Sequence, residues 1–101
     1  MKKYAVRISE SAQDDIYRLI DYISEIYKAP RTAEKYLIEL YDTIFSLQYL
    51  SESISVSPKA DILKYGTNAK SIVFKKLTIA FTVENDKVIV QAVMSGALVK
   101  N

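Results

Sequence analysis

The apolar and polar residues at the start of the chain change their spacing abruptly, from strand-like alternation to helical periodicity. Val6 and Ile8 alternate with Arg7, a pattern typical of a half-buried strand, which is predicted over residues 3–8. The apolar residues that follow recur at steps of three and four, which predicts an amphipathic helix over residues 10–27. They are Ala12, Ile16, Leu19, Ile20 and Ile23. A strand therefore leads directly into the helix that covers it.

Two serines between this strand and this helix are suitable N-terminal caps. Ser9 and Ser11 each carry a hydroxyl that can accept a hydrogen bond from the free backbone N–H groups of a first helical turn. Ser11 also has Asp14 three residues on, which is the spacing of a capping box. The pattern leaves open which serine caps the helix.

A second amphipathic helix follows after a short break. Pro30 and Thr32 suit its first turn, because proline lacks the N–H that a helix N-terminus leaves unbonded. Its apolar stripe consists of Ala33, Leu37, Leu40, Tyr41, Ile44 and Leu47. Because the connection is short, the two helices are expected to be antiparallel neighbours in an αα-hairpin.

The pattern weakens between about residues 51 and 69 and becomes β-like from residue 70. Pro58 interrupts the weak segment, in which a short strand is expected, and residues 65–68 (YGTN) predict a turn. Two further strands, LTIAFTV at 77–83 and VIVQAVM at 88–94, are apolar on much of both faces, which indicates central strands. The residues between them include Asn85 and Asp86, which tolerate the positive φ of a tight hairpin turn.

The predicted order of elements is β-α-α-β-β-β, in one domain that spans residues 1–101. Two adjacent helices cannot cover both faces of one sheet. The predicted fold class is therefore α+β, with a helical hairpin packed on one face of a mainly antiparallel sheet. The other sheet face is expected to be open and to carry the function.

Composition and charge exclude several classes of protein. Half of the residues are hydrophobic and the net charge is only +2, which indicates a folded protein and no strong electrostatic attraction to nucleic acid. Two lysines start the chain without a long apolar run behind them, so no signal peptide is expected. No run approaches the roughly 18 apolar residues of a membrane-spanning helix. Cysteine is absent, so the chain is expected in the cytoplasm.

Much familiar catalytic chemistry is absent from the sequence. There is no histidine, and the two glycines cannot form a phosphate-binding loop. The carboxylates of the first helix fall between its apolar positions and are expected on a solvated face rather than at a metal site. They are Asp14, Asp15, Asp21 and Glu25. No cofactor and no metal ion is expected.

Four lysines surround the start of the β region: Lys64, Lys70, Lys75 and Lys76. If a strand begins at residue 70, Ile72 and Phe74 should point at the helices and Lys75 at the open face. There Lys75 would join Arg7, Thr82 and Gln91. The alternative is that Lys75 and Lys76 flank a hairpin turn in solvent.

Taken in order, several segments resemble the RelE/ParE family of toxins over about residues 4–96. The N-terminal part is Tyr4-Ala5-Val6-Arg7-Ile8-Ser9, followed by Ala12, Asp15, Ile16, Ile20, Tyr22 and Ile23. The middle part is Pro30 followed by Ala33, in a helix that ends in Leu47. The last part is the strand, acidic turn and strand of residues 79–94 (IAFTVENDKVIVQAVM).

The resemblance implies the toxin of a bacterial type II toxin–antitoxin pair, of the plasmid-stabilisation type, which inhibits growth. Members of the family either cleave mRNA on the ribosome or poison DNA gyrase, and a cognate antitoxin holds each one inactive. The implied partners are therefore an antitoxin protein and either DNA gyrase or the ribosome with its mRNA. A homodimer or a hetero-oligomer with the antitoxin is also implied.

In the RNA-cleaving branch, basic residues on the open sheet face carry the reaction, often with a tyrosine. Cleavage through the 2′-hydroxyl needs a base, a cation for the developing charge and an acid for the leaving oxygen. By this resemblance, the catalytic candidates are Lys75, Lys70 and Tyr65. The binding candidates are Arg7, Lys64, Lys76 and Gln91.

The sequence departs from the RNA-cleaving branch at the family positions that carry the chemistry. Lys75 stands where that branch has an arginine. The positive charge is kept, but a lysine cannot form the two parallel hydrogen bonds that a guanidinium group makes to a phosphate. Residues 95–99 (SGALV) stand where a pair of basic residues is usual, with only Lys100 beyond. The helical hairpin, with its join at Pro30, looks more like that of the gyrase-directed ParE branch.

The resulting hypothesis is a ParE-like toxin that binds DNA gyrase and is neutralised by an antitoxin. Grooves along the helices and the sheet edge would receive the antitoxin by helix-in-groove docking or strand addition. One alternative is a RelE-like, ribosome-dependent mRNA endonuclease, and another is a non-toxic, degenerate antitoxin-binding domain. The apolar tail residues Ala97, Leu98 and Val99 are expected either to close over the core or to dock against a partner.

Overall fold

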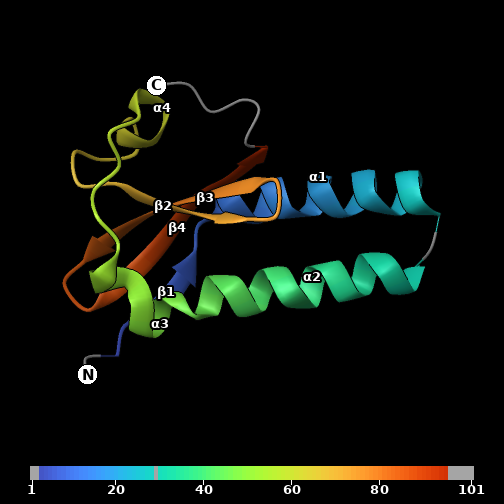
Figure 1. Cartoon of the computed structure of the whole chain (residues 1–101), viewed down its shortest axis with the longest axis horizontal. Helices are drawn as coiled ribbons and strands as arrows, with labels where there is room; N and C mark the ends of the chain where they lie inside the picture. Colours follow the sequence, from blue (N-terminus) through green and yellow to red (C-terminus); the bar gives the residue numbers. More distant parts are fainter. Residues whose placement is uncertain (1–2, 29, 96–101) are drawn as a thin grey trace.

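The structure, a computed structural model, describes residues 3–28 and 30–95 and has an α+β architecture (Figure 1). Its strands are β1 (Ala5–Ile8), β2 (Lys70–Phe74), β3 (Leu77–Glu84) and β4 (Lys87–Ser95). The two long helices are α1 (Glu10–Tyr27) and α2 (Pro30–Phe45), which run side by side as the predicted hairpin. Short helical segments follow at α3 (Leu47–Leu50), η1 (Ser51–Ser53) and α4 (Ala60–Leu63). The predicted β-α-α-β-β-β order is confirmed, with these short segments added before β2.

The four strands form one mixed sheet in the order β1-β4-β3-β2. The β2–β3 and β3–β4 pairs are antiparallel, and β1 is parallel to β4, with Val6 beside Val88 and Ile8 beside Val90. The sheet is therefore mainly antiparallel, as predicted. The two strands that are apolar on both faces, β3 and β4, take the two central places.

The apolar stripes of both long helices form the main core against one face of the sheet. Its fully buried residues include Ile16, Leu40, Ile44, Ile79, Phe81, Val88 and Val90. Ile72 and Phe74 of β2 pack against the same core, as predicted, and the ring of Phe74 meets Tyr36 of α2 edge-on with centroids 5.3 Å apart. Burial of each such side chain stabilises the fold by roughly 1.5–3 kcal/mol relative to exposure.

Ser9, and not Ser11, caps α1. The Ser9 backbone is extended, and its Oγ accepts a hydrogen bond of 3.0 Å from the backbone N–H of Ala12. The backbone N–H of Ser9 donates a hydrogen bond of 3.0 Å to the carbonyl of Val90 in β4, just after the last residue of β1. Ser11 lies exposed inside the first turn. One residue therefore ends the strand and starts the helix, which explains the abrupt change of periodicity.

The segment between α2 and β2 differs from the prediction. A strand expected within residues 51–69 is wrong, because the described residues there form η1, α4 and connecting turns. Pro58 has no backbone N–H that could donate a hydrogen bond to a neighbouring strand. The adjacent Ser57 N–H donates a sheet-like hydrogen bond of 2.9 Å to the carbonyl of Ala69. The predicted turn at residues 65–68 is confirmed.

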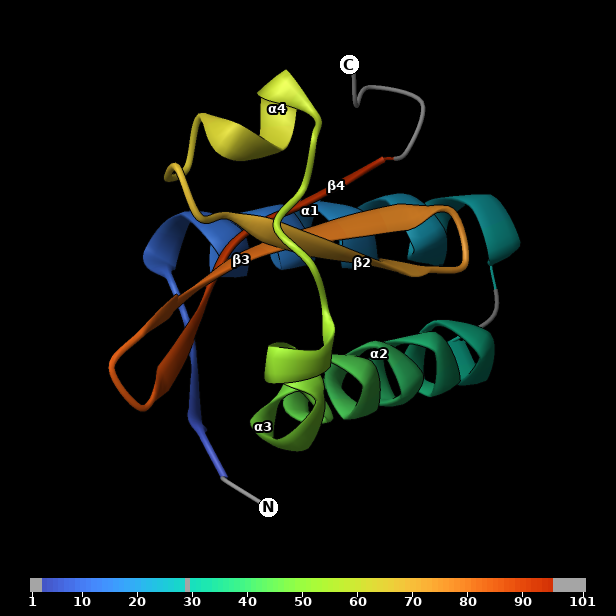
Figure 2. The same cartoon turned by 60° about the vertical axis from the view of Figure 1, so that its left-hand side comes forward.

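This segment covers the centre of the second sheet face, which was expected to be open. Ile62 of α4 and Ala69 pack on Ala80 of β3 and Ala92 of β4. Alanine on both strands lets the short helix approach the sheet closely. In Figure 2, α4 and α2 lie on opposite sides of the sheet. The prediction of an open face is therefore wrong over the middle of the sheet.

The N-terminal strand is fixed on its outer side by α3 and η1. The Tyr4 N–H donates to the carbonyl of Gln48 at 2.8 Å, and the Tyr4 hydroxyl donates to Oε1 of Glu52. Its hydrogen bond to this carboxylate raises the pKa of the Tyr4 hydroxyl above its ordinary value. No helix in the described part of the chain is long and apolar enough to cross a membrane. The tail residues Ala97, Leu98 and Val99 lie outside the described residues.

The cap assignment gives a paired stability prediction. We expect Ser9→Ala to lower the free energy of unfolding by about 1 kcal/mol, because an N–H of the first turn loses its acceptor. Ser11→Ala should change the free energy by no more than about 0.5 kcal/mol, because Ser11 is exposed within the helix. Urea unfolding followed by circular dichroism measures both, and equal losses from the two variants would contradict the assignment.

Candidate functional site

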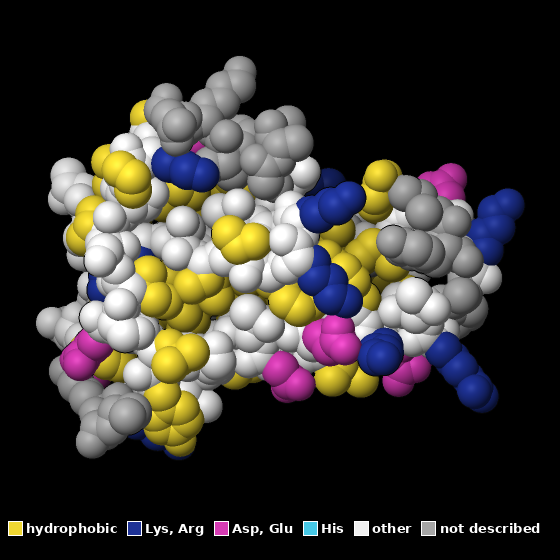
Figure 3. Space-filling view, viewed as in Figure 1, with side chains coloured by type: hydrophobic (Ala, Val, Ile, Leu, Met, Phe, Trp, Pro, Cys, Tyr) yellow, Lys and Arg dark blue, Asp and Glu magenta, His cyan; other side chains and the backbone are white. Residues whose placement is uncertain are grey.

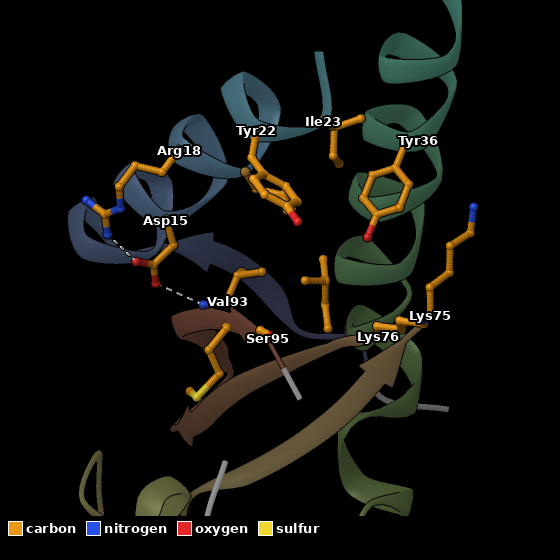
Figure 4. Close-up of a pocket in the computed structure, with 12 residues that line it drawn as sticks. Asp15, Arg18, Tyr22, Ile23, Tyr36, Lys75, Lys76, Val93 and Ser95 are labelled. Atoms are coloured by element: carbon orange, nitrogen blue, oxygen red, sulfur yellow. Dashed lines mark hydrogen bonds and ion pairs between the residues drawn. The ribbon is translucent and has the colours of Figure 1, made fainter. Parts of the chain in front are cut away.

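A cavity of about 810 Å³ lies between α1, α2, the β2–β3 turn and the end of β4 (Figure 4). We call it the α1–α2 groove. Its lining is Asp15, Arg18, Leu19, Tyr22, Ile23, Tyr36, Lys75, Lys76, Leu77, Val93, Met94 and Ser95. On the face seen in Figure 3, Lys and Arg side chains lie beside exposed hydrophobic side chains between the two long helices. The groove thus combines an apolar floor with a polar rim.

Two tyrosines form the helical walls of the groove. Tyr22 on α1 is 62% exposed, and Tyr36 on α2 is half-buried. Their rings face the space between the helices in Figure 4. Ile23 of α1 and Leu77 of β3 are buried beneath them. An exposed tyrosine beside buried aliphatic residues is an apolar contact surface with a polar tip, a type that is common in binding sites.

Asp15 connects α1 to the last part of β4, a role that was not predicted from the sequence. Its Oδ2 accepts a hydrogen bond of 3.0 Å from the backbone N–H of Val93, and its Oδ1 lies 2.6 Å from Nη2 of Arg18. The pairing of β1 with β4 ends at Ile8 and Val90, so the Val93 N–H lies beyond the part of β4 that β1 covers. The expectation of a solvated carboxylate is correct for the exposed Asp14 and wrong for Asp15.

Lys75 does not lie on the second sheet face, which corrects the strand-based prediction. It occupies the β2–β3 turn with φ 53°, a left-handed conformation that is uncommon for lysine. Its Nζ lies 3.0 Å from Oε2 of Glu39 on α2 and 4.9 Å from the ring centroid of Tyr36. The alternative prediction, that Lys75 and Lys76 flank a hairpin turn in solvent, is correct about the turn. It is wrong about the surroundings of Lys75, because the turn directs this side chain to α2.

The three catalytic candidates therefore occupy separate places. Lys70 lies beside Phe81 in the sheet register, and its Nζ donates to the carbonyl of Ser51 at 2.9 Å. Lys75 lies five positions further along an extended chain, a separation of about 16 Å. Tyr65 packs against the Ile62 cluster on the opposite face of the sheet. The structure brings no two of them to one reaction centre.

The binding candidates are divided in the same way. Gln91 lies in β4 at a register shift, and its Nε2 donates to Oγ1 of Thr82 at 3.1 Å. Arg7 is exposed beside Ile89 in the register of β1 and β4. The Nζ of Lys64 lies 5.4 Å from the ring centroid of Tyr65. Of the four binding candidates, Lys76 alone lines the α1–α2 groove.

The acidic residues of α1 do not assemble a metal site in the described part of the chain. Asp14, Asp21 and Glu25 are exposed, and no group of three or more His, Cys, Asp or Glu side chains there is placed to hold a metal ion. The lining of the groove consists mainly of apolar, aromatic and cationic side chains.

The bridge from α1 to β4 gives a prediction of its own. We expect Asp15→Ala to lower the free energy of unfolding by about 1–2 kcal/mol, because the buried Val93 N–H loses a charged acceptor. Exchange of the Val93 amide hydrogen, followed by NMR, should accelerate in this variant. Asp14→Ala is the matched control, because that carboxylate is exposed. Unchanged Val93 exchange in Asp15→Ala would contradict the bridge.

Comparison with known proteins identifies the fold through structure rather than sequence. No protein-family model matches the chain, and no curated protein matches it in sequence. Among solved structures, a chain of the "Chromosomal ParDE TA system from P. aeruginosa" is similar, with a TM-score of 0.76 and 12% sequence identity. The match covers 92% of this chain and 96% of that one. The predicted RelE/ParE-like fold is thereby confirmed.

Proposed function

We propose that this chain is the toxin component of a type II toxin–antitoxin pair, that it acts by binding DNA gyrase, and that a cognate antitoxin neutralises it. The observation that carries this proposal is the likeness, over nearly the whole length of both chains, to a chain of a ParDE toxin–antitoxin system. Because the likeness extends over 92% of this chain, little of it lies outside the shared fold.

Action by binding is supported by the arrangement of the lysines. Cleavage of a phosphodiester needs a base and a cation at one reaction centre. Lys75 instead pairs with Glu39 on the helical side, and Lys70 pairs with a backbone carbonyl at the other end of β2. A RelE-like RNA endonuclease would need these groups to converge. The proposal therefore favours a protein–protein mode of inhibition over catalysis.

Expression of the chain alone in a bacterial culture tests the proposal. We expect growth arrest, with long filamentous cells and blocked chromosome segregation, because inhibited gyrase prevents the separation of replicated DNA. Ile16→Asp supplies the unfolded control, since it places a carboxylate at a fully buried core position. Microscopy of cell length and nucleoid shape, together with colony counts, provides the measurement.

A second variant separates the binding mode from catalysis. Lys75→Ala should leave the arrest intact if the chain acts by binding. Rapid arrest without filaments, abolished by Lys75→Ala, would favour mRNA cleavage instead. Normal growth in the presence of soluble, folded protein would contradict a toxin function and favour the degenerate antitoxin-binding domain.

A further inference from the structure

Exposed apolar side chains of α1 and α2 meet on the outer side of the helical hairpin. The Nε2 of Gln13 on α1 donates to the hydroxyl of Tyr41 on α2 at 3.1 Å, which shows how the two helices align there. Tyr17 lies one turn after Gln13 on the same side of α1, and Ile38 lies about one turn before Tyr41 on α2. Because the helices run in opposite directions, Tyr17 and Ile38 occupy neighbouring positions.

These residues form a surface that is separate from the α1–α2 groove. Tyr17 is 59% exposed, Ile38 54% and Phe45 45%. The rings of Tyr41 and Phe45 stack with their centroids 6.3 Å apart. We call Tyr17, Ile38, Tyr41 and Phe45 the outer hairpin surface, and none of them lines the groove. Large apolar side chains that gather on one exposed face indicate a contact surface for another protein.

Carboxylates flank the outer hairpin surface on both helices. On α1 they stand three residues before and four residues after Tyr17, and on α2 four residues before and four after Ile38, so they share the helix face of each apolar residue. They are Asp14, Asp21, Glu34 and Asp42. All four are exposed, and none forms an ion pair with another of residues 3–28 and 30–95. Figure 3 shows Asp and Glu side chains beside hydrophobic ones along α2, at the lower edge of the molecule.

The helical hairpin is acidic although the whole chain is slightly basic. Residues 10–45 contain eight Asp or Glu and four Lys or Arg, a net charge of −4. The rest of the chain contains four Asp or Glu and ten Lys or Arg, a net charge of +6. Of the eight hairpin carboxylates, Asp15 is engaged by Arg18 and Glu39 by Lys75. The four that flank the outer hairpin surface therefore remain to attract a basic partner.

This charge selects among the molecules that could cover the surface. A nucleic acid would be repelled, because its phosphates carry the same sign. A second copy of this chain in a two-fold contact would bring the same carboxylates against one another. A protein that binds DNA, in contrast, must concentrate positive charge where it contacts the phosphates.

We propose that the outer hairpin surface docks on the basic, DNA-contacting surface of the target enzyme and competes with DNA for it. This inference rests on the proposed function, in which the target is DNA gyrase, and it assigns the part of this chain that meets the target. The flanking carboxylates pair with lysines or arginines that otherwise hold phosphates. Tyr17, Ile38 and Phe45 supply the apolar contact between these pairs.

Two assays with purified gyrase and the full chain test the proposal. One measures DNA supercoiling, and the other measures displacement of a fluorescently labelled DNA duplex from gyrase by anisotropy. We expect the wild-type chain to displace the duplex, and its half-inhibiting concentration to rise with the DNA concentration. Asp14→Asn combined with Asp21→Asn should raise that concentration by about tenfold, and by less at high salt, which screens exposed charges. Ile38→Ala should raise it by about fivefold, as loss of an interface anchor does.

Matched variants control for the chemistry of these substitutions. Glu84→Gln combined with Asp86→Asn also removes two exposed carboxylates, at the β3–β4 turn. Val73→Ala truncates an aliphatic side chain that is 71% exposed on β2. Both should stay within about twofold of the wild type, since neither site lies on the hairpin. All the altered side chains are exposed, so each variant is expected to fold, which circular dichroism checks.

Several outcomes would overturn the proposal. Equal inhibition by the wild type and by both hairpin variants would place the contact elsewhere and leave the toxin function intact. Inhibition while the duplex stays bound to gyrase would contradict competition with DNA. A dimer of this chain that Ile38→Ala dissolves, seen by light scattering, would identify a second copy as the occupant. Gyrase that neither binds nor responds to the folded wild type would contradict the proposed function and the surface assignment together.

Discussion

The parallel pairing of β1 with β4 is the constraint on which the rest of this structure depends. It joins the first strand of the chain to the last, and a parallel connection requires a crossover. The helical hairpin forms the first part of that crossover and lies back across the sheet. Ser9 ends β1 against Val90 and caps α1 in the same residue. Asp15 then holds the second turn of α1 to Val93.

The short length of β1 creates the candidate site. Because its register ends with Ile8 beside Val90, the last residues of β4 extend beyond it, next to α1. The β2–β3 turn closes the space from the other side, where Lys75 is held by Glu39 and by the face of Tyr36. The groove therefore follows from the strand lengths, and its charges are largely fixed by partners within the fold. Lys76, which is exposed, also lines the groove.

The sequence predicted the elements with long periodic patterns and missed those defined by few residues or by distant contacts. The stripes of α1 and α2, the Asn85 turn and the central strands were correct, because each follows from local periodicity or turn chemistry. Residues 60–63 are too short a helix to show a period, so the cover on the second sheet face was missed.

The site was less predictable than the fold, for two physical reasons. The side of the sheet reached by Lys75 depended on where β2 ends, because alternation no longer applies to a residue in a turn. Asp15 accepts a hydrogen bond from a residue 78 positions away, so no local sequence pattern predicts that contact. The most direct measurement is DNA supercoiling by purified gyrase with increasing amounts of this chain. The account predicts inhibition by the wild type and by Lys75→Ala alike. Full gyrase activity at saturating folded protein would contradict it.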